Sequence, residues 1–292
     1  MSIDRAVLFR LATSRRLEQT VRMLPRGERL AWRAASRYVS GRTAANAIAL
    51  ARELHQQGVG VSIDQFGESV LDGAVADSVA ADYLRLADEL AGAPHDAWLS
   101  VDLSHLGLDI DPSRCAEHLA AIARSLPEGR RIQVGAEDYH RSDAVLGCVL
   151  AVADEGLANR LGATAQANLR RAPADLDRLV QAGVHVRLVK GAYVESAARA
   201  MSYGEATDLA YLRLAHRLAA TDAQFSLATH DGVLREALLA SIGTRPVEQL
   251  LGVRPSVLSD LAARGIPIRV YVPFGNDWFR YWMRRLAESR GR

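Results

Sequence analysis

The stretch Val184-His185-Val186-Arg187-Leu188-Val189-Lys190-Gly191-Ala192-Tyr193 decides the fold. Its alternating and β-branched apolar residues lead into an Arg, a Lys and a Gly, which is typical of a buried strand that brings cations to an exposed end. Arg187 and Lys190 carry a large desolvation cost in such a strand unless they meet an anion or an electron-rich ring. Gly191 lets the backbone approach a ligand closely. The same pattern also fits an ordinary strand whose cations pair with helix carboxylates.

Seven further segments of apolar, β-branched or alternating residues flank this strand. Segments rich in Ala, Leu and Arg, long enough for helices, separate nearly all of them. With no linker or composition break, eight such units predict one α/β domain, a closed (β/α)8 barrel of the TIM type that covers residues 41–292. The predicted strands are 59–63, 97–103, 131–136, 162–167, 184–189, 224–229, 246–251 and 266–272.

Helices are expected at both ends of the chain. Residues 1–40 predict an N-terminal helical segment packed outside the barrel, with apolar residues at helical spacing in 29–39. Thr43 is a good N-cap for a helix that runs to about residue 57. Residues 276–288 predict a C-terminal helix with aromatic side chains on several faces, which favours its burial over the barrel mouth.

Composition narrows the class of protein. The 292 residues are 49% apolar and 24% charged, and no apolar run approaches the roughly 20 residues that cross a bilayer. A net charge of +2 argues against a nucleic-acid partner. Cys115 and Cys148 are too few for a disulfide scaffold and lack metal-ligand spacing, so we expect buried free thiols. Without the apolar region of a secretory signal at the N-terminus, a cytoplasmic location is expected.

Polar residues or glycine follow seven of the eight predicted strands, where a barrel of this type carries its catalytic groups. Acids, amides, cations and a His would therefore surround one mouth, which favours an active site over the scattered polar loops of a purely structural barrel. The sets are 64–68, 102–105, 135–139, Gln166, 190–193, 229–231 and 271–275.

The last helix carries Tyr281, Arg284, Arg285 and Glu288 at spacings of one, three and four residues. Tyr281, one of the two arginines and Glu288 can therefore share one side of the helix. Paired guanidinium groups beside a Tyr suit a ligand carboxylate, because Arg forms two parallel charge-assisted hydrogen bonds and keeps its charge when desolvated. A solvated basic C-terminal helix is the alternative.

Together these residues resemble the proline dehydrogenase family, flavin-dependent barrel enzymes that also form a domain of bacterial bifunctional proline-catabolic proteins. The resemblance covers the chain from about residue 40 to its end. The segments 187–193 and 271–285 are the specific ones. The matching segments are, in order, 63–68, 100–108, 166–171, 187–193, 228–230 and 269–288.

The resemblance implies FAD at the barrel mouth. Arg187 would lie against the isoalloxazine ring and stabilise the charge that reduction builds up there. Lys190 and the backbone from Val189 to Gly191 would contact the ribityl or pyrophosphate groups. The other cofactor-binding positions it implies are Gln166, Thr229, His230 and Glu288.

The resemblance also implies a substrate side. Tyr271 and Tyr281 would line it, Arg284 and Arg285 would hold the substrate carboxylate, and Glu68 would pair with Arg284 as a gate. In the family reaction a hydride leaves the carbon next to the ring nitrogen of proline for the flavin. The product is the cyclic imine Δ1-pyrroline-5-carboxylate, and a quinone or other electron acceptor reoxidises the flavin.

Several positions depart from the family pattern on the substrate side. Asp102 stands where the family has a Lys, and Gly135 where it has the Asp that pairs with that Lys. The change replaces an attraction for the substrate carboxylate by a repulsion, so we include Asp102 among the catalytic positions. Val194 replaces a Trp beside the adenine end of FAD. Pro246 and Glu248 replace a Glu and a Gln.

Two classes of function stay open. The first is the same hydride chemistry on proline or on a changed substrate, such as a diamino acid, a hydrazine or an N-substituted amino acid, because Asp102 can pair with an added cationic group. The second is a non-catalytic relative that binds flavin or a metabolite and acts as a partner or scaffold subunit.

Two further readings are weaker. A metal-dependent hydrolase fits poorly, because His105, His140 and His230 lack paired-ligand spacing. A basic N-terminal helix could make at most a peripheral membrane contact, with plain packing as the alternative.

Overall fold

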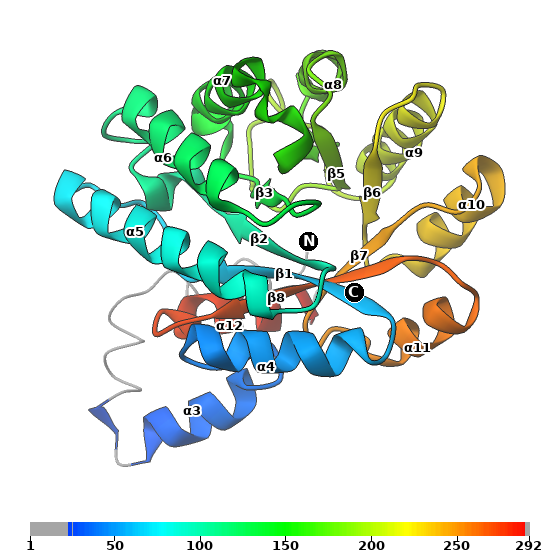
Figure 1. Cartoon of the computed structure of the whole chain (residues 1–292). Coiled ribbons are helices and arrows are strands. Elements are labelled where there is room, and N and C mark those ends of the chain that lie inside the picture. Colours follow the sequence, from blue (N-terminus) through cyan, green and yellow to red (C-terminus); the bar gives the residue numbers. More distant parts are fainter. Residues whose placement is uncertain (1–22, 25, 290–292) are drawn as a thin grey trace.

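Eight parallel strands close into a barrel in chain order, and β8 pairs with β1 (Figure 1). The computed structural model describes residues 23–24 and 26–289, apart from the side chains of residues 280, 284 and 286–289. All eight predicted strands are present, so the predicted (β/α)8 barrel is confirmed. The strands are β1 Val59–Gln65, β2 Ala97–Val101, β3 Ile132–Val134, β4 Leu161–Gln166, β5 His185–Val189, β6 Phe225–Ala228, β7 Val247–Leu250 and β8 Ile268–Phe274.

Helices surround the sheet and follow the strands in the expected alternation (Figure 1). The predicted cap at Thr43 is confirmed: its hydroxyl accepts from the Asn46 backbone amide, and the Asn46 side chain accepts from the Thr43 amide. The surrounding helices are α4 Ala44–His55, α5 Gly73–Glu89, α6 Pro112–Ser125, α7 Ser142–Val152, α8 Ala172–Gln181, α9 Glu205–Ala219, α10 Gly232–Ile242 and α11 Ser256–Ala263.

The two faces of the sheet differ sharply in chemistry. Outward side chains such as Ile63, Leu99 and Val186 are apolar and buried against the helices. Inward positions are polar, because Arg187 on β5 contacts Ser62 on β1, and strands that are not neighbours can meet only through the barrel interior. Barrels of this type usually fill that interior with Val, Ile and Leu. The polar residues inside this barrel therefore indicate a functional role for its interior.

An aromatic and cationic plug fills the barrel toward the amino ends of the strands. The Arg269 guanidinium lies 3.4 Å from the centre of the Trp98 ring, and His185 meets the same ring edge-on. Arg269 also donates to the carbonyls of Val61 and Asp96. Burial lowers the pKa of His185 to about 4, so this imidazole is neutral at physiological pH.

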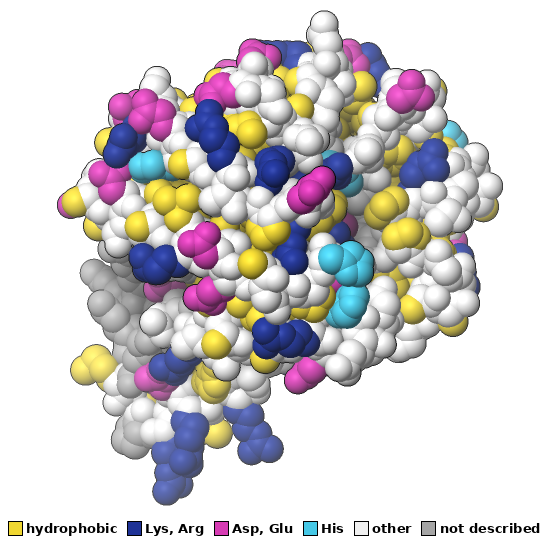
Figure 2. All heavy atoms as spheres, viewed as in Figure 1, with side chains coloured by type: hydrophobic (Ala, Val, Ile, Leu, Met, Phe, Trp, Pro, Cys, Tyr) yellow, Lys and Arg dark blue, Asp and Glu magenta, His cyan; other side chains and the backbone are white. Residues whose placement is uncertain are grey.

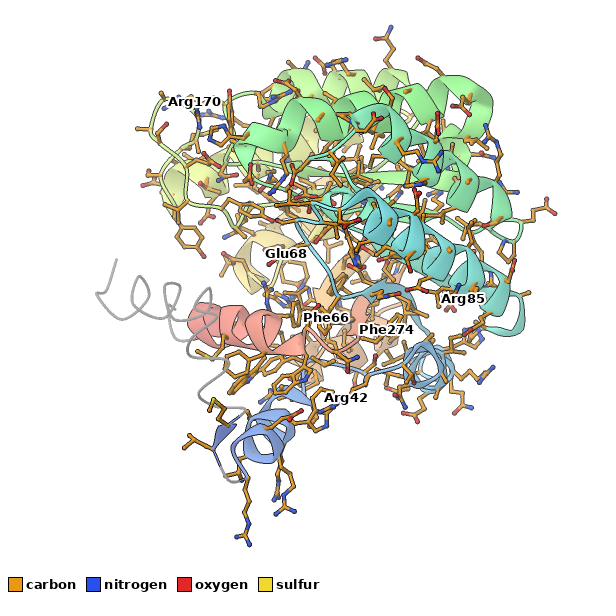
Figure 3. The ribbon with its side chains drawn as sticks, turned by 90° about the vertical axis from the view of Figure 1, so that its left-hand side faces the viewer. Arg42, Phe66, Glu68, Arg85, Arg170 and Phe274 are labelled. Carbon is orange, nitrogen blue, oxygen red and sulfur yellow. The ribbon has the colours of Figure 1, made fainter. Side chains whose placement is uncertain are left out.

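Two helices form a second apolar cluster outside the barrel, α3 Gly27–Ala35 and α12 Trp278–Ser289. Trp32 of α3 meets Trp278 of α12 edge-on at 5.1 Å, and Trp278 is fully buried. The predicted helix over 29–39 is thus present but begins and ends earlier, and residues 1–22 lie outside the described residues. Figure 3 shows α3 beneath α12, away from the barrel strands.

Charge is mixed over the face of the barrel in Figure 2, where Lys and Arg alternate with Asp and Glu. Basic side chains gather at the bottom of that view, over α3, whose exposed arginines include Arg29 and Arg33. In the described part of the chain, no helix has the length and apolar character needed to span a membrane.

Candidate active site at the barrel mouth

Arg187 lies inside the upper barrel rather than at an exposed strand end. Its Nε donates to Glu248 Oε2 at 2.7 Å and its Nη2 to Ser62 Oγ at 3.3 Å. Ser226 Oγ donates to the other Glu248 oxygen at 2.5 Å. For Arg187, the predicted desolvation cost is therefore offset by a carboxylate on β7 and not by a helix carboxylate.

A buried carboxyl ends β1. Asp64 accepts a hydrogen bond from Tyr271 Oη at 2.6 Å and another from Tyr83 Oη at 2.7 Å. Burial raises the pKa of Asp64 to about 6, although both tyrosines and the Arg187 charge act against the rise. Tyr271, predicted as catalytic, is held by this carboxyl, and burial raises the pKa of its hydroxyl well above the ordinary value.

Asp102 and Gly135 lie against each other on the ends of β2 and β3. A Cβ built on Gly135 would come within 1.9 Å of Asp102 Oδ1, so the carboxylate occupies the space that a side chain at position 135 would need. Asp102 is half-buried, and its charge contributes to the raised pKa of Tyr271. The two departures from the family pattern are thus one coupled change in shape.

Glu137 and Gln166 join the ends of β3 and β4. Glu137 Oε1 accepts from the Ser104 amide at 2.7 Å, and Arg141 approaches the other oxygen to 3.6 Å. Burial raises the pKa of Glu137. Gln166 Nε2 donates to the Glu137 carbonyl at 2.8 Å, while the Gln166 Oε1 atom is buried and has no hydrogen-bond partner among the described residues.

Lys190 meets two carboxylates beyond the end of β5. Its ammonium lies 2.6 Å from Asp208 and 2.8 Å from Asp231. Burial would lower the pKa of Lys190, but these hydrogen bonds outweigh it and raise the pKa. Gly191 follows at φ +107°, and a Cβ there would fall 1.9 Å from Asn168 Oδ1. Position 191 therefore admits only glycine, and the backbone there is open to a close approach.

The β6 end places Thr229 and His230 beside β7. The Thr229 carbonyl accepts from Gln249 Nε2 at 2.7 Å. His230 Nε2 lies 3.3 Å from the Leu250 amide, which fixes the imidazole plane over the β7 end. Val189 is half-buried at the inner side of the β5 end, next to these residues in the strand order.

The C-terminal helix brings Tyr281 and Arg285 to the same mouth. The Tyr281 ring lies 5.1 Å from Phe66 and 6.1 Å from Tyr271, and the Arg285 guanidinium stacks over Tyr281 at 5.0 Å. Figure 3 shows Phe66 and Phe274 beside one end of α12, with Glu68 above that helix. The side chains of Arg284 and Glu288 lie outside the described residues, so the predicted Glu68 gate stays a prediction.

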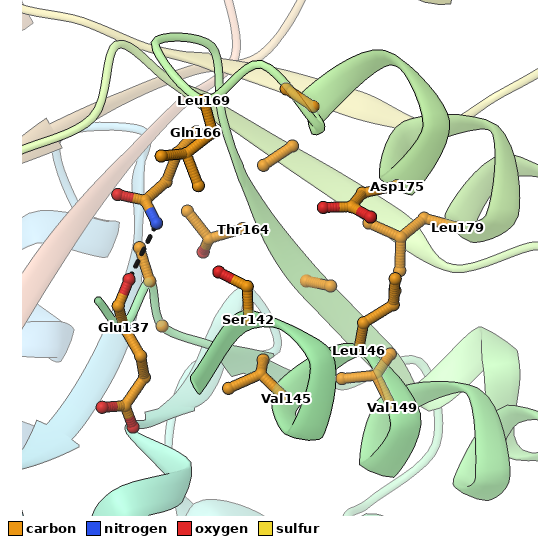
Figure 4. A pocket seen from close by; sticks show the side chains of 15 residues that line it. Glu137, Ser142, Val145, Leu146, Val149, Thr164, Gln166, Leu169, Asp175 and Leu179 are labelled. Carbon is orange, nitrogen blue, oxygen red and sulfur yellow. Dashed lines mark hydrogen bonds between the residues drawn. The ribbon is translucent and has the colours of Figure 1, made fainter. Parts of the chain in front are cut away.

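A cavity of about 50 Å³ lies between β4 and helices α7 and α8 (Figure 4). Gln166 and Glu137 line one side of it, and Leu146, Val149 and Leu179 line the opposite side. Small-molecule sites usually measure about 300–1,000 Å³. This cavity is therefore a packing gap and not the ligand site.

Apart from Arg187, which lies inside the barrel, the predicted side chains whose positions the structure describes lie at or beyond the carboxyl ends of the strands and on α12. Two residues were not assigned roles from the sequence: Asp64, the partner of Tyr271, and Glu248, the partner of Arg187. A signal was present in the alternation of Ser62 and Asp64 along β1, since residues two apart face the same side of a strand. In the described part of the chain, no three His, Cys, Asp or Glu side chains form a group that could hold a metal ion.

Comparison with known proteins places this mouth in a family. The sequence profile described as "Proline dehydrogenase" matches residues 47–292. The chain is 31% identical over 262 residues to "Proline dehydrogenase 1" of Bacillus subtilis subsp. natto, covering 87% of this chain and 86% of that one. It is also 31% identical over 287 residues to "Proline dehydrogenase" of Deinococcus radiodurans, covering 92% of each.

Solved structures share the fold. Proline utilization A from Bdellovibrio bacteriovorus, inactivated by N-propargylglycine, superposes with a TM-score of 0.83 at 17% identity, over 98% of this chain and 36% of that one. The Bradyrhizobium japonicum protein, mutant D779W, gives 0.73 at 24% identity, over 90% and 31%. This chain thus spans about a third of those longer proteins, whereas it spans most of the Bacillus and Deinococcus relatives. The profile match and these relatives show that the chain belongs to the proline dehydrogenase family.

Proposed function

We propose that the chain is an FAD-dependent dehydrogenase that oxidises L-proline to Δ1-pyrroline-5-carboxylate and passes the electrons to a quinone or similar acceptor. The observation that carries the proposal is the family match over residues 47–292, because that range contains every strand of the mouth. The relatives are named as dehydrogenases, which favours turnover over a non-catalytic scaffold.

The residues at the mouth fit a flavin. Gln166 Oε1 is a buried acceptor with no partner in the described structure, and such an atom calls for a donor such as a ring N–H. Gly191 leaves backbone exposed where a side chain would collide with Asn168. Asn168 Oδ1 is likewise buried with no hydrogen-bond partner in the described part of the chain. Two acceptors and a bare backbone turn thus lie at the ends of neighbouring strands.

The predicted cofactor residues whose side chains the structure describes have proposed roles, whereas Glu288 stays a prediction. When bound, the flavin supplies the acceptor for a hydride. Arg187, whose guanidinium is held by Glu248 and Ser62, would place a fixed positive charge beside it. Lys190 orders the turn before Gly191 through Asp208 and Asp231, so its contact with the cofactor would be secondary to that role. Thr229, His230 and Val189 would line the remaining edge.

The substrate side uses α12 and β8. Arg285, stacked on Tyr281, would bind the substrate carboxylate, and the Tyr271 hydroxyl, fixed by Asp64, would face the substrate amine. The stacked guanidinium gives the carboxylate a planar partner of fixed orientation. An amino acid would therefore lie between α12 and the β1 and β8 strand ends.

A second substrate class has a specific observation in its favour. Asp102 places a carboxylate at the β2 end, beside the Asp64 carboxyl at the β1 end. Two acids on adjacent strand ends would favour an amino acid that carries an additional cationic group, such as a diamino acid. This candidate differs from proline only at the end of the substrate that faces β2.

A substrate comparison tests both candidates. The flavin-loaded protein is assayed with L-proline, D-proline and L-ornithine and a soluble quinone analogue, and the product is trapped as its imine adduct. We expect kcat/KM to be highest for L-proline and at least tenfold lower for D-proline. A preference for ornithine would support the second substrate class, and no turnover of any of them would reject the proposal.

The chain division is also a proposal. Residues 1–40 would form a helical segment and residues 41–292 the barrel. In support, Ser40 donates a hydrogen bond to the Pro273 carbonyl, and Gly41 forms an isolated parallel β-bridge with Phe274. The chain therefore joins the edge of the barrel at this point.

A further inference from the structure

We infer that Glu248 is a positioning residue that offsets the charge of Arg187 and thereby sets the reduction potential of the bound flavin. The inference rests on the proposed function, in which the flavin lies over Arg187. It concerns a residue in the barrel interior, beneath the mouth, that would not itself touch the flavin or the substrate.

The contacts make Glu248 the main partner of Arg187. Its two oxygens accept from Arg187 Nε at 2.7 Å and from Ser226 Oγ at 2.5 Å, and its side chain is 5% exposed. Ser62 Oγ accepts a hydrogen bond from Arg187 Nη2. The carboxylate and the serine thus fix the plane of the guanidinium group.

The carboxylate stays charged in this setting. Burial alone would raise the pKa of Glu248, but the charges of Arg187 and Arg269 and the Ser226 hydrogen bond outweigh it and lower the pKa. His185, which faces the same carboxylate, is neutral because burial lowers its pKa to about 4. The upper interior therefore holds a fixed guanidinium and a fixed carboxylate within hydrogen-bond distance of each other.

The consequence for a redox group follows from electrostatics. Reduction adds negative charge to the flavin, which a nearby cation favours and a nearby anion opposes, and both effects are strong where water is excluded. The negative charge of Glu248 therefore reduces the stabilisation that Arg187 gives to the reduced flavin. Replacing it by Gln keeps the size, an acceptor for Arg187 Nε and a polar partner for Ser226, but removes the negative charge.

The test measures the flavin midpoint potential of wild type and Glu248→Gln by anaerobic titration against a reference dye. We expect the variant to shift the two-electron equilibrium toward reduced flavin by tenfold or more, which equals about 30 mV. Glu236→Gln, which removes the same charge from a half-buried carboxylate paired with Arg264, should leave the potential unchanged. Ser226→Ala removes a hydrogen bond but no charge and should shift the potential far less.

Glu248→Asp is the second arm, because it retains the charge and draws the carboxylate back by one methylene. Its potential should lie between those of wild type and Glu248→Gln. An unchanged or lower potential in Glu248→Gln would overturn the inference, as would an unchanged potential in Glu248→Asp if the Gln variant did not fold. If the wild-type protein contains no flavin, the proposed function is rejected as well. If the wild-type flavin is reduced by proline but the potential of Glu248→Gln is unchanged, only the inference about Glu248 is rejected.

Discussion

The carboxyl group of Asp64 has a raised pKa because of where it lies in the barrel. Asp64 is 4% exposed and accepts hydrogen bonds from two tyrosine hydroxyls. Both hydroxyls are neutral, so they stabilise the carboxylate less than a cation in hydrogen-bond contact would. Desolvation therefore outweighs the hydrogen bonds, and the pKa rises from 3.8 to about 6. Because Tyr271 depends on this carboxyl for its orientation, protonation of Asp64 would change the hydrogen-bonding of the substrate side.

The raised pKa of Asp64 predicts a pH dependence of stability. Between pH 3.8 and 6 the folded state binds more protons at this site than the unfolded chain, so the contribution of Asp64 falls as the pH rises. In Asp64→Asn that contribution is absent. Relative to wild type, the variant should gain about 2 kcal/mol in unfolding free energy between pH 4.5 and 7.5, measured by urea denaturation.

The exposed Asp222→Asn is the control for this measurement, and it should follow wild type at both pH values. If wild type and Asp64→Asn changed in parallel with pH, the carboxyl would not be desolvated as the structure indicates.

Asp102 and Gly135 give a prediction about a coupled pair. Gly135→Asp alone would force a new carboxylate into the space of Asp102 Oδ1, so it should destabilise the protein by about 2 kcal/mol or more and lower proline turnover. Adding Asp102→Lys places an ammonium group beside the new carboxylate at position 135, so the two form an ion pair, and the melting temperature should be restored. In the double variant kcat/KM for L-proline should exceed that of wild type by tenfold or more.

The two variants answer different questions. A stable Gly135→Asp would show that Asp102 does not fill that space. A well-folded double variant with no gain on proline would show that these two positions do not set the substrate preference.

At the scale of elements, strands and caps could be predicted from the sequence, but partners across the barrel could not. Strand patterns are local, which is why all eight strands were located to within a few residues. Arg187 and Glu248 are 61 residues apart, and Tyr271 and Asp64 are 207 apart. Such pairs depend on the closure of the barrel and on strand register, which no local pattern contains.

The turn after β5 yields a prediction at this scale. In Gly191→Ala the new methyl group would collide with Asn168 Oδ1 at a backbone φ of +107°, so the turn must distort. We expect the ratio of bound flavin to protein to fall at least tenfold, measured from the visible absorbance of the purified variant.

Gly147→Ala provides the matched control. Gly147 lies inside α7 with no atom within 4 Å of a built Cβ, so an alanine there should keep the flavin and stabilise the helix by about 0.5–1 kcal/mol. Full flavin content in Gly191→Ala would mean that the cofactor does not approach this turn.

On the scale of the whole molecule, two apolar cores meet at the mouth. The outer face of the barrel packs against the helices, and the α3 and α12 cluster reaches the mouth through Phe66 and Tyr271. The polar barrel interior lies between them. This arrangement makes the position of Arg285 on α12 depend on α3, which lies near the other end of the chain.

Truncation tests that dependence. Deleting residues 1–40 removes α3 and exposes Trp278 and Phe279, so it should cost about 3 kcal/mol or more of unfolding free energy and raise KM for proline. The comparator is the chain shortened by residues 1–22, which retains α3. Equal melting temperature and KM in the two truncated chains would show that α3 does not support the mouth.

The most direct test of the central claim is the visible absorbance spectrum of the purified protein before and after anaerobic addition of L-proline. The account predicts a flavin spectrum that bleaches on addition of proline. A flavin spectrum that stays oxidised would contradict proline as the substrate, and a protein without flavin absorbance would contradict the enzymatic function itself.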